Sequence, residues 1–347
     1  MFSKYDNKGY TGLSNLGNTC FLNSCLQILN HTYELHELFD QDKTELHIKT
    51  KTVDSILLQE WNDLRKIIWS NNGTVAPNRF VNQLQKVSHA KNRELFTGWN
   101  QNDMPEFLLL MIECFHNSIS RKINIKISGK KENSTDNMAI VCYTMLKQTY
   151  SKEYSEIMDL FYGIYVSTLS VSENGPSSNN VPESYFMLYL SIPDHKSIVS
   201  LHDCFDLFTK VEFMTKEDSG YKNEKTGEAE DVYKQIKFWN FPNLLVINLK
   251  RFSSDGKHKI KNMVEFPIND LDLSKYVVGY NSSKYIYDLY GVCNHIGGVN
   301  MGHYTAFVRN SKNEWIHFND DSVEIVKDER SIITPMAYCL FYRKKNK

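Results

Sequence analysis

The fold of this chain is decided near its start, by the stretch Gly12-Leu13-Ser14-Asn15-Leu16-Gly17-Asn18-Thr19-Cys20. Glycines and a cap-forming Asn precede an amphipathic pattern, because apolar residues recur at spacings of three and four between Thr19 and Leu35. The pattern predicts a helix that begins at 18–20. It therefore places the Cys20 sulfur at a helix N-terminus.

Unpaired backbone N–H groups and the positive end of the helix dipole stabilise a thiolate at that position. We therefore expect a lowered pKa for Cys20 and a role as nucleophile. Most cysteines are buried core residues instead. Cys25 lies in mid-helix on the apolar face and fits that alternative. The same holds for the remaining cysteines, which are Cys114, Cys142, Cys204, Cys293 and Cys339.

The seven cysteines are scattered, and no Cys-x-x-Cys pair occurs among them. This pattern argues against a disulfide framework and against a zinc ribbon. It favours an intracellular, reducing compartment, cytoplasmic or nuclear, and of the host cell if the protein is viral.

The composition is that of an ordinary globular protein. With 347 residues, of which 41% are hydrophobic, the chain can bury one large core or two medium ones. A net charge of -1 disfavours nucleic acid as a partner. Met1–Gly9 is polar, and the longest apolar runs, such as Leu244–Leu249, have the length of a strand. We expect a soluble monomer that is not secreted and does not span a membrane.

The first third is predicted to be mainly helical, with further helices at Val53–Ile68 and about Pro105–Ile119. The polar segment Arg121–Met138 predicts an exposed insertion. From Asp159 onward, runs rich in β-branched and aromatic residues predict strands at Phe161–Leu169, Tyr185–Ile192, Val232–Trp239 and Leu244–Phe252. The long polar breaks Ser172–Asn180 and Lys216–Glu230 predict the tips of projecting hairpins.

Three candidate strands near the C-terminal end predict an antiparallel meander, Tyr285–Asn294, His303–Arg309 and Trp315–Phe318. A turn centred between 311 and 312 would place His303 opposite Asn319 or Asp320, about 4.5–5.5 Å away. A hydrogen bond from such a neighbour fixes the tautomer of a histidine that acts as general base. The alternative is a surface histidine beside an ordinary turn. His295 and His317 have no such partner in register and are interpreted as structural or surface residues.

Two segments resemble the signature blocks of the ubiquitin-specific protease family of papain-like cysteine deubiquitinases. Gly12–Gln27 is similar to its cysteine box, His295–Val323 to its histidine box, and Leu249–Phe252 to a third block on a core strand. The resemblance extends over about Gly9 to Arg343. It implies an α+β fold and one catalytic domain at 9–345, with a helical thumb at about 9–158, largely fingers hairpins at 159–240 and a largely β-sheet palm at 241–345.

The resemblance also implies an activity. Ubiquitin-specific proteases hydrolyse the bond at the C-terminal glycine of ubiquitin, here through a thioester on Cys20 and without a cofactor. His303 matches the general base, and Asn319 matches the residue that orients it, with Asp320 in support. Asn15 matches the donor to the oxyanion of the tetrahedral intermediate. Ubiquitin, ubiquitinated proteins and polyubiquitin are the implied partners.

The block Gln101–Phe107 resembles the family segment that begins a helix lining the groove for the ubiquitin tail, with departures at Asn102 and Pro105. The implied substrate contacts are Gln101, Asp103, Glu106 and Phe107. A structural alternative is as strong, because Asp103 as N-cap, Pro105 in the first turn and Glu106 three residues after the cap suit a capping-box-like helix start. The two interpretations are compatible.

Gly297, Gly298 and Gly302 form a loop just before the predicted base, and the resemblance makes this loop a lip over the terminal Gly-Gly of ubiquitin. Tyr304 is a further implied substrate contact. Glycine permits close approach of one backbone to another, which suits a channel for a chain end without side chains. An ordinary hairpin loop is the alternative.

The clearest departure from the family lies in the fingers. Many members hold a structural zinc there with two Cys-x-x-Cys pairs, and this chain has none. The sequence therefore predicts metal-free fingers held by packing and strand pairing. Two other functions stay open, a ubiquitin-binding module without catalysis and a cysteine deconjugase acting on another ubiquitin-like modifier.

Overall fold

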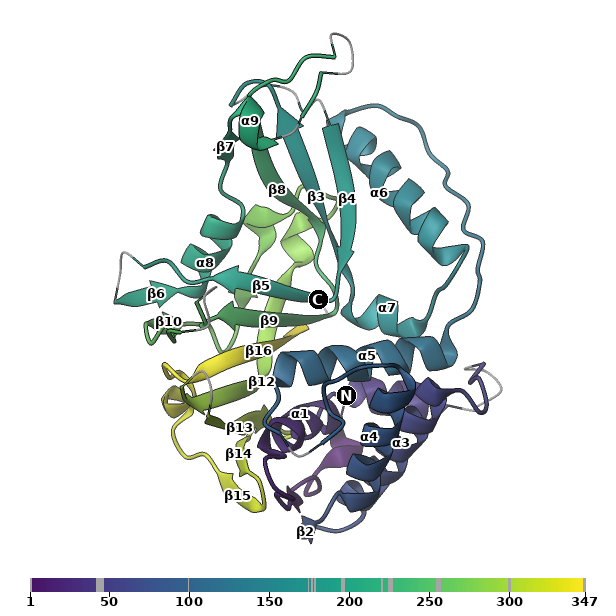
Figure 1. Ribbon diagram of the computed structural model, residues 1–347, viewed down its shortest axis with the longest axis vertical. Helices are drawn as coiled ribbons and strands as arrows, with labels where there is room; N and C mark the ends of the chain where they lie inside the picture. Colours follow the sequence, from purple (N-terminus) through teal and green to yellow (C-terminus); the bar gives the residue numbers. More distant parts are fainter. Residues whose placement is uncertain are drawn as a thin grey trace.

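The computed structural model describes residues 2–41, 47–98, 100–173, 175, 177, 179–194, 197–219, 221–223, 227–253, 257–298 and 301–345. Figure 1 shows helices α1 to α5 gathered against one sheet, while a second sheet projects away from them with helix α6 along its side. We use the names thumb for the helices α1 to α5, palm for the sheet beside them and fingers for the projecting sheet.

The thumb is built from helices of the N-terminal third, α1 (Cys20–Asn30), α2 (Tyr33–Phe39), α3 (Val53–Ser70), α4 (Asn78–Ala90) and α5 (Met104–Ile119). The predicted helix between Thr19 and Leu35 is two helices, because side chains take over the last carbonyls of α1. Thr32 Oγ1 donates to the Ile28 carbonyl at 2.9 Å, and His31 Nδ1 lies 2.8 Å from the Gln27 carbonyl.

Helix α5 forms the centre of the thumb. Most of its apolar side chains are buried, and it packs against α1, α3 and α7 (Glu156–Phe161), although Leu109 is 37% exposed. Its position brings its N-terminal end to the strand that carries His303.

The palm sheet has the order β15-β14-β13-β12-β16-β9-β5, with β11 (Leu271–Asp272) paired to β12. Its other strands are β5 (Met187–Ser191), β9 (Leu244–Lys250), β12 (Ile286–Gly297), β13 (Gly302–Arg309), β14 (Trp315–Asn319), β15 (Ser322–Ile325) and β16 (Ala337–Lys344). Strands β12, β13 and β14 pair antiparallel in sequence order, so the predicted meander is confirmed.

Strand β9 shows why the sequence of a palm strand can be apolar at nearly every position. Leu244 and Val246 belong to the core shared with the thumb helices, whereas Leu245, Ile247 and Leu249 belong to a second core on the opposite face. Successive side chains point to opposite faces of a strand. Both faces of this strand are therefore covered, and no polar alternation is left in its sequence.

The fingers sheet has the order β4-β3-β8-β7, formed by β3 (Gly163–Ser170), β4 (Asn179–Tyr185), β7 (Glu212–Met214) and β8 (Val232–Asn240). The predicted breaks join β3 to β4 and β7 to β8, although parts of both lie outside the described residues. A small core of Ala139, Cys142, Ile164, Val166 and Trp239 fastens this sheet to α6.

Helix α6 (Ser134–Tyr150) corrects one expectation. The last residues of the predicted insertion Arg121–Met138 are helical, because Asn133 and Asp136 form a reciprocal capping box at the helix start. The rest of the insertion is an extended connection. The short helix α7 (Glu156–Phe161) then leads into β3.

Smaller elements complete the fold: β1 (Gly12–Leu13), β2 (Thr74–Val75), β6 (Ile198–Ser200), α8 (Leu201–Phe208), α9 (Lys216–Ser219) and β10 (Met263–Glu265). Within the described residues, no helix has both the length and the apolar character needed to cross a bilayer. The same residues contain no cluster of three or more His, Cys, Asp or Glu side chains that could hold a metal ion.

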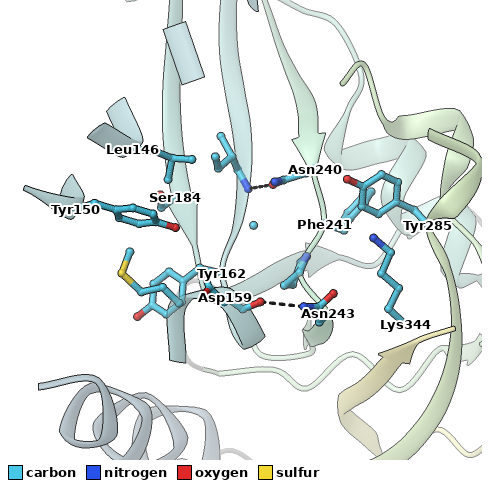
Figure 2. A pocket seen from close by; sticks show the side chains of 14 residues that line it. Leu146, Tyr150, Asp159, Tyr162, Ser184, Asn240, Phe241, Asn243, Tyr285 and Lys344 are labelled. Atoms are coloured by element: carbon cyan, nitrogen blue, oxygen red, sulfur yellow. Dashed lines mark hydrogen bonds between the residues drawn. The ribbon is translucent and has the colours of Figure 1, made fainter. Parts of the chain in front are cut away.

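A pocket of about 370 Å³ lies where the fingers meet the palm and the helices α6 and α7. Figure 2 shows Tyr150 on one side of it and Tyr285 with Lys344 on the other. None of the residues that line it is among the predicted site residues.

Candidate active site

Cys20 is the first residue of α1, and the loop before it is folded by its own side chains. Gly17 and Asn18 both have positive φ, 101° and 56°. Asn15 Oδ1 accepts from the backbone N–H groups of Gly17 at 2.9 Å and Thr19 at 3.2 Å. The loop therefore fixes the side-chain oxygen of Asn15, while the Asn15 NH₂ group donates to Asp320.

The Cys20 thiol is enclosed, with 3% of the residue exposed. Burial raises its pKa, and the charge of Asp320 adds to this, while the backbone N–H groups of Tyr304, Phe21 and Cys20 itself act in the opposite direction. The predicted lowering of the Cys20 pKa is thus wrong for this structure, because desolvation outweighs the helix N-terminus. Since the Tyr304 N–H lies beside the sulfur, so does the start of β13.

His303 lies at that start, and its Nε2–H donates to Asn319 Oδ1 at 2.6 Å. The proton on Nε2 leaves Nδ1 as the nitrogen that can accept a proton. The predicted register is wrong, however. Ala306 pairs with Phe318, so that Thr305 rather than His303 falls in line with Asn319. The imidazole reaches Asn319 diagonally, as residues offset by two on one face do.

The turn between β14 and β15 joins the palm to the thumb at this point. Asp320 accepts from Asn15 Nδ2 at 2.9 Å and from Asn23 Nδ2 at 2.8 Å. Gly12 is required here, because a Cβ at that position would lie 2.5 Å from the Asp321 carbonyl oxygen. One turn therefore carries both the orienter of the histidine and the partner of Asn15.

Sequence reasoning missed Asn23. Its side chain also donates to the carbonyls of Leu13 and Ser14, at 3.2 and 3.3 Å, and so fixes the loop before Cys20 from within the helix. The available signal was a polar residue three positions after Cys20, on the same face of the helix as the sulfur.

Gln101 clamps the residue before the histidine. Its Nε2 donates to the Gly302 carbonyl and its Oε1 accepts from the Gly302 N–H, both at 3.0 Å. A side-chain amide that pairs with one residue in both directions mimics a neighbouring strand. Gln101 thereby holds the start of β13 against the thumb.

Asp103 occupies the N-cap of α5, but its side chain makes no capping hydrogen bond, so the predicted capping box does not form. Its carboxylate accepts instead from the hydroxyls of Tyr304 at 2.9 Å and Tyr338 at 3.0 Å. Burial raises the pKa of Asp103. The predicted contact Tyr304 is thus tied to the thumb, and Tyr338, which the sequence did not single out, joins it.

The other two members of this block differ from each other. Glu106 is exposed and available to a ligand. Phe107 has no exposed surface and packs against Phe21 and Phe96, with ring centroids 5.7 Å away in both cases. A direct contact of Phe107 with substrate is therefore excluded in this structure, because the thumb core encloses the ring.

The glycine loop, residues 297–302, closes between β12 and β13. Gly297 pairs with Gly302 and has φ 110°, and the Gly298 N–H donates to the Met301 carbonyl at 2.9 Å. Met301 is 78% exposed. Residues 299 and 300 lie outside the described residues. The described end of the loop, Gly302, is thus the residue that begins the strand of His303.

Together these groups can perform nucleophilic acyl transfer. A thiol lies at a helix N-terminus, a histidine with a fixed tautomer begins the neighbouring strand, and an amide NH₂ projects from the loop before the thiol. Figure 1 places α1 beside β13, and these elements are in contact.

Comparisons with known proteins give a consistent result. The family model described as "Ubiquitin carboxyl-terminal hydrolase" matches residues 11–342. The chain is 33% identical to human "Ubiquitin carboxyl-terminal hydrolase 2" over 96% of its own length, and 32% identical to "Ubiquitin carboxyl-terminal hydrolase 21" of Bos taurus over 96%.

Among solved structures, the chain is similar to the Ubp8-containing SAGA DUB module bound to monoubiquitin. The TM-score is 0.74 at 25% identity, with 100% of this chain and 71% of that chain covered. The same module bound to ubiquitin aldehyde matches with a TM-score of 0.74, at 25% identity and with 99% and 71% covered. These matches confirm the predicted α+β fold class.

The chain spans about half the length of the curated relatives it matches, 55% of the human protein and 61% of the bovine one.

Proposed function

Because this chain belongs to the ubiquitin carboxyl-terminal hydrolase family, we propose that it is a cysteine-dependent deubiquitinase. Its substrates are ubiquitinated proteins or polyubiquitin, and the bond that it cleaves is the amide, usually an isopeptide to lysine, at the C-terminal glycine of ubiquitin. Cys20 is the nucleophile, His303 the general base and Asn319 the residue that orients it.

One observation carries the proposal more than any other. The start of β13 supplies both the histidine bonded to Asn319 at 2.6 Å and the backbone N–H of Tyr304 beside the Cys20 sulfur. Base and nucleophile are therefore neighbours through adjacent residues of one strand.

The reaction begins with the thiol form, since the raised pKa of Cys20 disfavours a resting thiolate. His303 Nδ1 takes the proton as the sulfur attacks the carbonyl carbon of the terminal glycine. The imidazolium then protonates the departing lysine amine, and the C–N bond breaks. In the second half His303 removes a proton from water, which attacks the thioester and releases the ubiquitin carboxylate and the Cys20 thiol.

Asn15 donates to the oxyanion in both halves of the reaction. Its NH₂ group has two hydrogens, and only one is needed for the bond to Asp320. The backbone N–H of Cys20 at the helix start is the second donor. Asp320 thus acts as a supporting residue through Asn15, which differs from direct support of the histidine.

The tail of ubiquitin is expected to enter between α5 and the glycine loop, next to Gln101, Glu106, Gly297, Gly298 and Gly302. Exposed Glu106 suits the arginine-containing end of ubiquitin. The fingers then support the globular body of ubiquitin without a metal. We further propose that the protein acts as a monomer in an intracellular compartment, where its seven cysteines, all free in the structure, stay reduced.

The decisive experiment treats the protein with ubiquitin that carries a C-terminal electrophile. Labelling at Cys20, located by mass spectrometry, is the expected result. Cys20→Ala should abolish labelling and turnover while ubiquitin binding and the melting temperature stay close to wild type. Cys25→Ala is the matched control, because Cys25 lies on the same helix in the core, and this variant should still be labelled.

The same probe made with other ubiquitin-like modifiers separates the alternatives. Labelling by another modifier in preference to ubiquitin would show a different deconjugase. Binding of ubiquitin without labelling would show a module that lacks catalysis. Full turnover by Cys20→Ala would contradict the proposed mechanism outright.

A further inference from the structure

A lysine from the segment after β9 reaches the base of the glycine loop. Lys259 Nζ donates to the His295 carbonyl at 2.6 Å, contacts His295 Nδ1 at 2.9 Å and lies 3.3 Å from the Gly297 carbonyl. His295 and Gly297 end β12 and lead through the loop to His303. We call this set of three contacts the Lys259 bridge.

The bridge starts from a fixed support. Arg251 is fully buried, and it donates to the Ala337 carbonyl at 2.6 Å and to the carbonyls of Ile260 at 3.1 Å and Asn262 at 3.0 Å. The Ile260 N–H in turn donates to the Arg251 carbonyl at 2.6 Å. The residue that follows Lys259 is therefore tied to the palm sheet. Because its neighbour is fixed in this way, Lys259 can limit the movement of the glycine loop.

The bridge also decides how His295 is protonated. An ammonium group only donates, so Nδ1 of His295 has to accept and the ring proton lies on Nε2. Burial, with the Lys259 charge second, lowers the pKa of His295 to about 4, which keeps the ring neutral. Nε2 lies against Gly302, where a Cβ would be only 2.0 Å away. The neutral ring thus fills the space beside the residue that precedes His303.

Aromatic rings hold the imidazole in this orientation. Tyr304 and Phe252 lie 4.7 and 5.3 Å from it between ring centroids, and Lys259 Nζ lies 5.8 Å over the Phe252 ring. Lys259, His295 and Gly302 therefore form one packed unit with the first residues of β13. A shift of the ammonium group would be passed to Gly302.

We propose that Lys259 is a positioning residue for catalysis, which through His295 holds Gly297 and Gly302 where the terminal Gly-Gly of the substrate must pass. The inference rests on the proposed deubiquitinase function. Lys259 touches no reacting atom, and its effect is on the alignment of the substrate tail and of His303. Misplacement of reacting groups by about 1 Å costs about a hundredfold in rate.

The bridge is sensitive to pH. Burial, and then the nearby charges of Arg251 and Lys261, lower the pKa of Lys259 to about 8. The other titratable groups around it are His295 on β12 and Lys257 and His258 on its own segment. Among the described residues that line the hollow of about 730 Å³ here, there is no carboxylate to hold the proton. The bridge therefore weakens as the pH rises through about 8.

The test measures hydrolysis of a fluorogenic C-terminal amide of ubiquitin against pH. Lys259→Met should lower kcat/KM about tenfold to a hundredfold. Lys261→Met, which removes the same charge from an exposed position of the same segment, should stay near wild type. Lys259→Arg should retain activity and, because arginine stays protonated, should keep it above pH 8, where the wild type loses activity relative to this variant.

A second measurement does not depend on turnover. The ¹⁵N chemical shifts of the His295 ring should report the Nε2–H tautomer in the wild type and a mixture of tautomers in Lys259→Met, at unchanged melting temperature. Wild-type kcat/KM in Lys259→Met, or a constant ratio of Lys259→Arg to wild type across pH 7 to 10, would overturn the inference alone. A wild-type protein that does not hydrolyse ubiquitin conjugates would overturn the proposed function, and the inference with it.

Discussion

At the scale of single residues, the surroundings of Cys20 disfavour an ion pair between a Cys20 thiolate and a His303 imidazolium in the resting protein. Cys20 stands at a helix N-terminus, yet its enclosure by the thumb and β13 raises its pKa. The free energy that desolvation of the thiolate costs is larger than the stabilisation that the partial positive charge of the helix N-terminus provides. In the proposed mechanism the nucleophile is therefore generated when His303 takes the proton, and the orientation of that ring depends on the bond to Asn319.

Asp320 should set the ionisation of Cys20. Its negative charge raises the thiol pKa, so Asp320→Asn should shift the pH profile of Cys20 alkylation by iodoacetamide toward lower pH. Asn15 and Asn23 donate to different carboxylate oxygens of Asp320, so the single amide oxygen of the variant keeps one of these two bonds. The rate of modification at Cys20, followed by mass spectrometry between pH 6 and 10, measures the shift.

The neighbouring carboxylate provides the control for this prediction. Asp321 is exposed and is not among the groups that influence the Cys20 pKa. Asp321→Asn should leave the profile in place. An unchanged profile in Asp320→Asn, or a shift toward higher pH, would show that the charge of Asp320 does not reach the sulfur.

At the scale of elements, the β12–β13 hairpin depends on the absence of a side chain at Gly302. A Cβ there would lie 2.0 Å from His295 Nε2, so Gly302→Ala must displace the ring or the loop. We expect kcat/KM for a ubiquitin amide to fall at least about tenfold. Gly98→Ala, where no atom lies within 4 Å of the added Cβ, should behave like the wild type.

The steric origin of this effect can be isolated by a second change. His295→Ala removes the ring that the new methyl group would strike, so the double variant should regain activity relative to Gly302→Ala in a double-mutant cycle. Independent effects of the two substitutions would contradict the packing argument.

The spacing of apolar residues predicted the helices and strands whose buried side chains recur with a single period along the sequence. The helices predicted at Val53–Ile68 and Pro105–Ile119 are observed at Val53–Ser70 and Met104–Ile119. Their apolar residues recur with the period of a helix because these helices pack on neighbours along their length. The meander was equally accessible, since its strands follow one another and short turns join them.

Features that depend on distant partners escaped prediction. The register at His303 was missed because Asn313, with φ 63°, centres the turn near residue 312. The hydrogen bonds of Asp103 were not predicted, because its partners Tyr304 and Tyr338 come from two strands more than 200 residues later in the chain. The sequence next to His303 and Asp103 specifies neither the strand register nor the hydrogen-bond partners. Resemblance to a family supplied the site roles that local physics left open.

At the scale of the whole molecule, one ion pair joins thumb to palm far from the active site. Arg343 of β16 donates to both carboxylate oxygens of Glu34 in α2, at 2.6 and 3.0 Å. Its guanidinium also lies 4.4 Å over the Tyr290 ring and 5.6 Å over the Tyr33 ring. Both charged side chains are mostly buried, with 22% and 19% exposed.

Glu34→Gln should therefore destabilise the protein. It leaves a largely buried guanidinium without its counter-charge, which typically costs about 2 kcal/mol. Asp206→Asn is the comparison, because its pair with Lys275 is 56% exposed on both sides and such pairs contribute less than about 1 kcal/mol. Urea denaturation measures both. A Glu34→Gln midpoint equal to that of Asp206→Asn would show that this contact does not hold the subdomains together.

The position of β16 has a consequence for how the protein is made. This strand lies between β12 and β9, in the interior of the palm sheet, although it follows all the other strands of that sheet in the sequence. Until residue 344 has emerged, the nascent chain carries two unpaired strand edges, which invite association with other chains. A premature stop codon before residue 337 would make that state permanent. Such a product should be a substrate for chaperones and degradation, even though it would already contain Cys20, His303 and Asn319.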